Sequence, residues 1–236
     1  MPRKPRLALA HHPHHIVQRS HSQHAIFTTD ADRVSYLATL QEFRRALSLK
    51  VYAYCLMDDH IHLVVDPGDN ATGISLLMKR LAGRHTRRVN LLQERRGTAW
   101  EGRFMCSPIE VDRYLLACIC FVELNPVRTQ LVAQPEEYAW SSYRARAGIV
   151  DCEWIDLDPC YLALAEIPEL RQERYREFVR KGIRPHELKF IRNAVRRNEP
   201  TASAAFVMAL GGGDGSEKEQ QRLNEVASAA CARGRK

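Results

Sequence analysis

The sequence lacks an apolar run long enough to cross a membrane. Its longest uncharged apolar run, Tyr114–Val122, is far shorter than the roughly 20 residues that a membrane-spanning helix needs. The basic start, Met1–Arg6, is not followed by the apolar stretch of a secretory signal. The seven cysteines are an odd number and include no CxxC pair, which favours reduced thiols over a disulfide framework. These absences predict a cytoplasmic protein without a membrane partner.

Acidic residues are locally scarce. The chain of 236 residues carries 35 Lys and Arg against 28 Asp and Glu, a net charge of +7, and no acidic residue occurs between Gly73 and Gln93. Within this segment four arginines fall on one helical stripe beside Lys79, at Arg80, Arg84, Arg87 and Arg88. A stripe without compensating acid predicts a surface that faces phosphates. The alternative is a solvated helix that arginine keeps soluble.

The hydrophobic pattern predicts an α+β fold. Strands are expected near residues 15–19, 51–57, 60–65 and 103–109, and helices near 30–47, 74–94 and 112–124. Asp30 or Asp32 is expected to cap the first helix and Asp112 the third, which Pro126 should end. This order is the ferredoxin-like βαββαβ arrangement with one more helix.

The chain is expected to have three parts. Residues 1–150 form the ferredoxin-like domain, 151–210 a helical Arg-rich extension, and 211–236 a flexible basic tail that follows a glycine-rich break.

Two histidines are the first candidates for chemistry. His60 and His62 lie two residues apart on a predicted strand, so both side chains project from one face and can share one divalent cation. The alternative is a pair of solvated strand histidines. Asp58 and Asp59 precede them and are expected to form the turn rather than to add ligands.

The other histidines are expected to be less informative. A cluster near the N-terminus resembles a metal-binding tract but is expected to be a solvated arm; its members are His11, His12, His14 and His15. His85 is expected on the charged face of the second helix.

Five short segments resemble, in order, the motifs of one protein family. They are residues 54–65 (YCLMDDHIHLVV), 77–81 (LMKRL), 100–104 (WEGRF), 123–128 (ELNPVR) and 138–143 (YAWSSY). Together they resemble the REP-associated tyrosine transposases, a branch of the single-tyrosine HUH transposases (IS200-like domain) that acts on hairpin-forming DNA. The resemblance covers about residues 5–150.

The resemblance implies both a fold and a mechanism. Its ferredoxin-like catalytic domain agrees with the predicted order of elements. In this family two histidines and a polar residue on the following helix bind Mg²⁺ or Mn²⁺, and a helix tyrosine attacks the scissile phosphate to form a 5′-phosphotyrosine. By resemblance, His60 and His62 are the expected histidine ligands. Asn125 is the expected third ligand, with an oxygen suited to a hard cation.

The chain departs from the family at the nucleophile. The family places its tyrosine four residues before the asparagine, where this chain has Phe121. Phenylalanine has no hydroxyl to form the covalent link, and losing a nucleophile typically costs on the order of 10⁶ in rate. Three explanations stay open: an engineered exchange, a natural copy without cleavage, or a substitute residue. Tyr114 is the obvious substitute, but about 10 Å of helical rise separates it from Phe121, and packing is its expected role. Cys118 and Cys120 are expected to be buried.

The expected function is therefore that of a transposase-like DNA-binding protein of the HUH class, active on single-stranded or REP-like hairpin DNA, and nucleoid-associated when bound. Whether it nicks and rejoins DNA depends on Phe121. The alternatives are a non-catalytic, domesticated hairpin-binding or regulatory protein, and a metal-dependent phosphodiesterase that uses water. The residues expected to contact DNA are Lys79, Arg80, Arg84, Arg87, Arg88, Arg103 and Arg128. A homodimer is a further expectation, because relatives outside this branch act as dimers.

Three aromatic residues and one acidic residue have open roles. Trp100, Phe104 and Tyr143 are expected either to stack on unpaired bases or to pack in the core. Glu123 is expected to face solvent or to pair with a neighbouring arginine.

Overall fold

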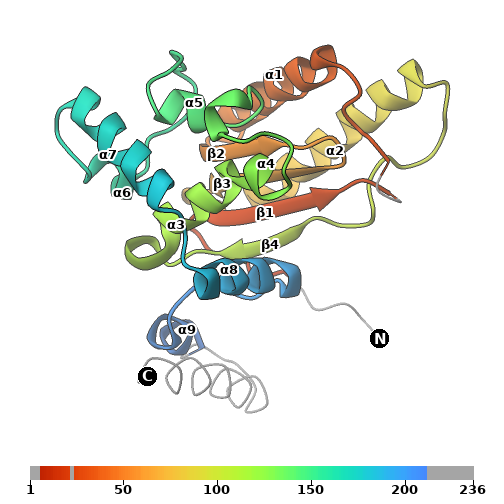
Figure 1. Cartoon of the computed structure of the whole chain (residues 1–236). Helices are drawn as coiled ribbons and strands as arrows, with labels where there is room; N and C mark the ends of the chain where they lie inside the picture. The colour runs from red at the N-terminus through yellow and green to blue at the C-terminus, as the bar shows by residue number, and fades with distance from the viewer. Residues whose placement is uncertain (1–5, 22–23, 212–236) are drawn as a thin grey trace.

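A computed structural model describes residues 6–21 and 24–211, and the predicted tail lies outside this range except for Gly211 (Figure 1). The elements follow the order β1 (His14–Arg19), α1 (Asp30–Ala46), β2 (Lys50–Leu56), β3 (His60–Asp66), α2 (Thr72–Leu92), β4 (Met105–Pro108), α3 (Val111–Glu123), α4 (Asn125–Arg128), η2 (Pro135–Glu137), α5 (Tyr143–Arg146), α6 (Pro159–Leu162), α7 (Pro168–Lys181), α8 (Pro185–Arg197) and α9 (Ala204–Gly211).

The four strands form one sheet in the order β2-β3-β1-β4. Each adjacent pair is antiparallel, with Val17 of β1 opposite His62 of β3 on one side and Met105 of β4 on the other. Together with α1, α2 and the additional helix α3, this confirms the predicted α+β fold with helices that follow the sheet.

Helices cover both faces of the sheet. Ile61 and Leu63 of β3 pack with Leu40 of α1 and Leu77 of α2 in one core. Val64, on the opposite face, packs with α3 and the later helices in a second core. Successive strand residues point to opposite faces, so six consecutive residues of β3, from His60 to Val65, are buried.

Both outer strands of the sheet are paired with chain that follows α3. Along β2, Leu56 N donates to Trp140 O and Ser142 N to Tyr54 O. Along β4, Thr201 N donates to Pro108 O, and Asn198 Oδ1 accepts from Cys106 N at 2.9 Å. The extension after residue 150 therefore packs directly on the sheet, although the domain boundary at 150 stays a prediction.

The helices begin within two residues of their predicted starts, but the predicted capping residues are wrong. Thr29 caps α1, and Asp32 is its third residue in a reciprocal capping box, so neither Asp30 nor Asp32 is the cap. The residue before α3 is Glu110 rather than Asp112.

The end of α3 also differs from the prediction. Leu124 ends α3, and Pro126 lies in the first turn of the short helix α4 that follows at once. Proline is favoured there because the first helical N–H groups have no intrahelical acceptor.

No helix in the described part of the chain is both long and apolar enough to cross a membrane.

Candidate active site

His60 and His62 project from β3 toward the face of the sheet that α3 covers. Both side chains are buried, at 8% and 6% exposure, and their ring centroids lie 5.1 Å apart. The structure therefore brings the predicted pair together on one face and contradicts the alternative of solvated histidines.

A second contact fixes each ring. Nδ1 of His60 lies 2.5 Å from Oδ1 of Asp59, and Nδ1 of His62 lies 2.9 Å from Nε2 of His15. The sites on Nδ1 are thus occupied, so a ligand would bind through Nε2 of each ring, which at His60 is in contact with Asn125. Histidines that bind metals commonly have such a partner on the other ring nitrogen, which sets the tautomer and the ring orientation. Asp59 thereby has a role beyond the turn to which the sequence assigned it.

Asn125 reaches the same place from the turn between α3 and α4. Its Nδ2 lies 2.9 Å from Nε2 of His60, while its Oδ1 accepts a hydrogen bond of 3.0 Å from Nη2 of Arg128. Asn125 is the first residue of α4, one residue after the end of α3, and its contacts with His60 and Arg128 hold its side chain beside β3.

Phe121 faces the same histidines from the last turns of α3. Its ring centroid lies 5.5 Å from that of His15 and 6.1 Å from that of His62. The guanidinium carbon of Arg128 lies 4.0 Å from the centre of the ring, and Nη1 of Arg128 donates to Phe121 O at 2.6 Å. Phe121, Asn125 and the histidine pair therefore form one cluster with His15 and Arg128.

The cluster keeps its imidazoles neutral. Burial lowers the pKa of His60 and lowers that of His62 well below the usual value, and it lowers the pKa of His15 to about 3. The charges of Arg128 and Arg19 act in the same direction on the pair, while Asp59 partly opposes them at His60. Neutral imidazole is the form that binds a metal.

The cluster offers two imidazole nitrogens and one amide as donors. Among the described residues there is no group of three or more His, Cys, Asp or Glu side chains arranged to hold a metal. A cation here would therefore depend on His60, His62 and the amide oxygen of Asn125. The fixed rings and the adjacent amide fit such a group.

Residues 9–119 match the family model described as "Transposase IS200 like". This segment belongs to the IS200-like transposase family. The match includes β1 and the histidine pair of β3 and stops before Phe121 and Asn125. No curated protein matches the chain.

Two solved structures resemble the IS200-like chain. One is titled as a REP-associated tyrosine transposase bound to a REP hairpin; it is 12% identical, covers 67% of this chain and 99% of its own, and has a TM-score of 0.55. The other is a putative transposase from Deinococcus radiodurans R1, 18% identical, covering 48% of this chain and 88% of its own, with a TM-score of 0.35. At 12% identity the first likeness shows a shared fold.

The arginine stripe of the IS200-like domain lies on the other side of the sheet. Helix α2 packs with α1 on the face away from the histidine pair. Arg84 forms an ion pair with Glu42 of α1, and Arg88 forms one with Asp32, so α1 supplies the acid that residues 73–93 lack. Arg80 and Arg87 are exposed, and neither has an ion pair with the described carboxylates.

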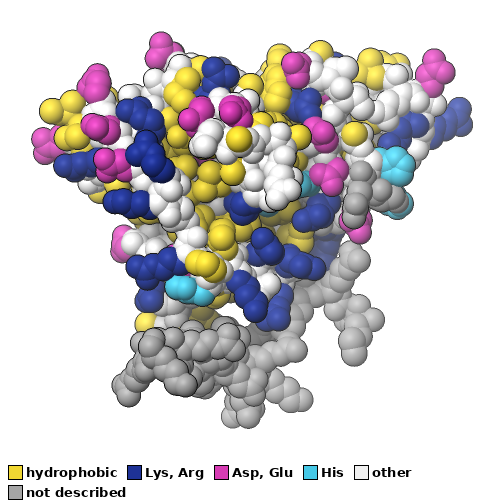
Figure 2. Space-filling model, in the orientation of Figure 1, with side chains coloured by type: hydrophobic (Ala, Val, Ile, Leu, Met, Phe, Trp, Pro, Cys, Tyr) yellow, Lys and Arg dark blue, Asp and Glu magenta, His cyan; other side chains and the backbone are white. Residues whose placement is uncertain are grey.

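A second basic surface lies on the histidine side, and the sequence did not reveal it. Figure 2 shows Lys and Arg side chains gathered over β1, β4 and α8. Arg19 pairs with His60 in the β1–β3 register, and Arg192 of α8 acts electrostatically on Arg128. Arg103 is exposed just before β4. Of these, sequence reasoning singled out only Arg103 and Arg128, because sheet register and helix docking decide the others.

Three histidines of the IS200-like domain lie where the sequence did not place them. His14 and His15 belong to β1 and are fully buried, so the prediction of a solvated arm is wrong for both. The pairing of β1 with β3, which only the fold supplies, brings His15 to His62. His85 is buried as well; its Nε2 lies 2.8 Å from Ile26 O, which contradicts a place on the charged face.

Glu123 is fully buried in the IS200-like domain and does not face solvent. It accepts hydrogen bonds from Ser142 and Tyr175 and lies 3.6 Å from Nε of Arg146, which confirms a pairing with arginine. Trp100, Phe104 and Tyr143 are also buried, as core packing requires.

Proposed function

We propose that this protein binds single-stranded or hairpin DNA on the histidine side of its sheet and lacks the covalent cleavage step of its family. One observation carries the proposal: Phe121, which by resemblance takes the place of the family's tyrosine, packs against the histidines. The protein is then a non-catalytic or regulatory relative that keeps the binding surface.

Membership of a transposase family supports a DNA partner. A structure that shares the fold is titled as bound to a REP hairpin. On this chain, Arg19, Arg128 and Arg192 give the histidine side an excess of positive charge, and phosphate neutralisation supplies much of the affinity for DNA.

We further propose His60, His62 and Asn125 as the ligands of a divalent Mg²⁺ or Mn²⁺. Such an ion supplies charge that orients and polarises a phosphate. In the structure the nitrogen of the Asn125 amide faces His60 and its oxygen faces Arg128. A hard cation prefers the oxygen, so binding would require the amide to turn over and would free Arg128 for a phosphate.

The described neighbours of Phe121 do not include a ready substitute nucleophile. Tyr114 contacts Phe190 of α8, with ring centroids 5.3 Å apart, and burial raises its pKa. Burial also raises the pKa of Cys118, and that of Cys120 to about 12, which keeps both as thiols.

The test compares this chain with Phe121→Tyr and Phe121→Leu on an end-labelled REP-like hairpin with single-stranded flanks and Mn²⁺. All three proteins should bind the hairpin, and only Phe121→Tyr should form a protein–DNA adduct that survives denaturation. The Leu variant controls for any change at the ring position.

Each other result has a distinct meaning. An adduct with the unchanged chain would show that another residue attacks. Free cleaved product without an adduct would favour a phosphodiesterase that uses water. Failure of the unchanged chain to bind either hairpin or single-stranded DNA would refute the proposal.

A further inference from the structure

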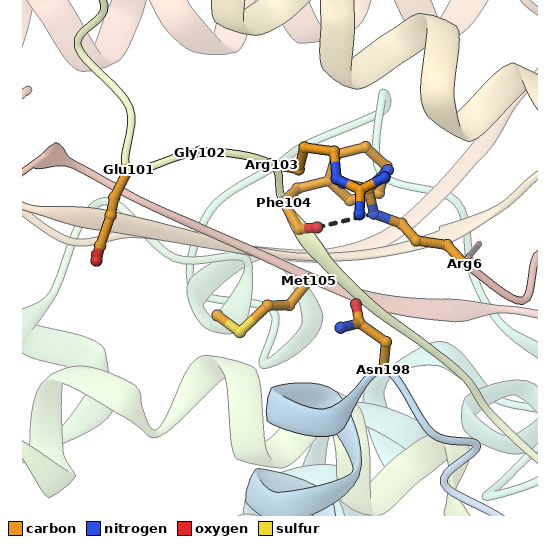
Figure 3. Close-up of a pocket in the computed structure, with 7 residues that line it drawn as sticks. All are labelled: Arg6, Glu101, Gly102, Arg103, Phe104, Met105 and Asn198. Atoms are coloured by element: carbon orange, nitrogen blue, oxygen red, sulfur yellow. Dashed lines mark hydrogen bonds between the residues drawn. The ribbon is translucent and has the colours of Figure 1, made fainter. Parts of the chain in front are cut away.

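A cavity of about 310 Å³ lies beside β4, and three separate parts of the chain line it (Figure 3). The N-terminal arm supplies Arg6, the loop before β4 supplies residues 101–104, and the end of α8 supplies Asn198. Met105, the first residue of β4, lines it as well, between the loop and Asn198. Two of these parts, the arm and the extension, lie outside the βαββαβ core.

The sheet connects this cavity to the histidine pair. Val17 of β1 lies opposite both His62 and Met105, and directly opposed residues share a face. With strands about 4.8 Å apart, the backbones of His62 and Met105 are separated by roughly 10 Å. Glu101 N also donates to Arg19 O, and Arg19 is the register partner of His60. A DNA strand at the histidines would therefore have its next nucleotide near this cavity.

A flat cationic surface forms one wall of the cavity. The guanidinium carbon of Arg6 lies 3.8 Å from the centre of the Phe104 ring, and Nε of Arg6 donates to Phe104 O at 2.9 Å. These contacts hold the guanidinium over the ring at the wall of the cavity (Figure 3). Guanidinium planes are surfaces on which unpaired bases stack.

The charges of this wall are not neutralised within the described structure. Burial, together with the nearby charge of Arg103, lowers the pKa of Arg6, and neither arginine forms an ion pair with a described carboxylate, although Glu101 also lines the cavity. Two adjacent cations that are not engaged in ion pairs favour an anionic ligand, such as a phosphate.

The opposite side carries groups that suit the edge of a base. Oδ1 of Asn198 is used by Cys106 N, while Nδ2 has no hydrogen-bond partner among the described residues and is left as a donor. A stacking plane, a cationic flank and a donor on the Asn198 amide together match a nucleotide better than a free anion, which would use only the charge.

We propose that this cavity binds one unpaired nucleotide of the DNA strand that lies at the histidine pair. Its base stacks on Arg6, its phosphate lies near Arg103, and its edge faces the Asn198 amide. The inference rests on the proposed DNA-binding function and adds that the arm and the extension select the flank of the hairpin.

The test measures hairpin affinity by fluorescence anisotropy, using the full chain and labelled hairpins whose flanking nucleotides are replaced by abasic sites one at a time. The unchanged chain should lose about tenfold in affinity at one flanking position, the usual scale for one stacked base. Two variants probe the cavity. Arg6→Lys keeps the charge without the plane, and Asn198→Asp keeps the Oδ1 acceptor for Cys106 N without the donor.

Both variants should bind the hairpin with the intact flank more weakly than the unchanged chain does. The abasic replacement should then lower their affinity by less than about twofold, because the contact with the base is already lost. Arg180→Ala, at an exposed position near the end of α7, is the control for loss of charge and should keep the full abasic effect.

An abasic effect of equal size in all four proteins, or no sensitive position in the unchanged chain, would overturn the cavity proposal. Because hairpin binding would persist in either case, the proposed function would stand. Loss of all DNA binding by the unchanged chain would refute the proposed function, and this inference with it.

Discussion

Arg146 is the buried charge on which the contact between the core and the extension depends. Its side chain is 1% exposed, and its Nη1 donates to Asp158 at 2.8 Å. It also donates to Tyr52 O of β2, and its Nε lies 3.6 Å from the carboxylate of Glu123. One guanidinium thus serves two carboxylates that have no access to water.

Replacing Arg146 with Met keeps most of the volume and removes the charge. Breaking a buried ion pair on one side typically costs about 3–5 kcal/mol of unfolding free energy, since the remaining charge is buried without a partner. For a chain of this size that corresponds to a fall of roughly 10 °C in Tm. Thermal and urea unfolding, followed by circular dichroism, measure both quantities.

The loss should grow as the pH rises. Burial raises the pKa of Glu123, and Arg146 opposes that rise. Without the arginine the folded chain holds the Glu123 proton more tightly than the unfolded chain does. Stability therefore falls progressively above the ordinary pKa of a carboxyl group. The deficit at pH 8 should exceed the deficit at pH 5.

Two further variants make the test decisive. Arg146→Met combined with Asp158→Asn removes one of the orphaned charges and should recover part of the loss. Arg144→Met, two residues away and without an ion pair among the described side chains, should change the unfolding free energy by less than about 0.5 kcal/mol. A loss below about 1 kcal/mol for Arg146→Met would refute this account of the buried network.

Three other outcomes are expected. Burial lowers the pKa of His14 to about 4, so the unfolded chain binds more protons below pH 6.5. His14 alone should therefore contribute about 2 kcal/mol to the fall in stability between pH 7 and pH 5, and a slope in His14→Gln as steep as in the unchanged chain would contradict this. His15→Gln should weaken Mn²⁺ binding about 10- to 100-fold in titration calorimetry, and unchanged affinity would show that His15 does not orient His62. Arg80→Ala with Arg87→Ala should reduce the salt dependence of hairpin binding by a slope of about one to two if α2 contacts phosphates, whereas an identical slope would remove α2 from the interface.

The sequence predicts the sheet well because side chains along a strand alternate between its two faces, which leaves a local pattern in the sequence. The hairpin of β2 and β3 and its two histidines follow from local alternation alone. The capping residues are predicted less accurately, because a cap is set by backbone conformation as well as residue type. Thr29, which adopts an extended conformation, caps α1 in preference to the acidic residues that follow it.

The sequence predicted only some of the residues of the site. His60 and His62 are two residues apart, but His15 reaches them only through the pairing of β1 with β3. For α2 the sequence predicted a stripe of arginines without compensating acid. In the structure Arg84 forms an ion pair with Glu42, a residue 42 positions away on another helix. Both cases depend on contacts between elements that are distant in the sequence, and a local sequence pattern carries no information about such contacts.

The pairing of β2 with Trp140 and Ser142, and of β4 with Thr201, has a consequence for assembly. Open sheet edges are templates on which a second chain can add a strand. Here the later parts of the same chain already use hydrogen-bonding groups on both outer strands. If two copies of this protein associate, they would therefore do so through side chains on the helical surfaces rather than by joining their sheets, and substitutions in those surfaces would change association without disturbing the strands that hold the histidines.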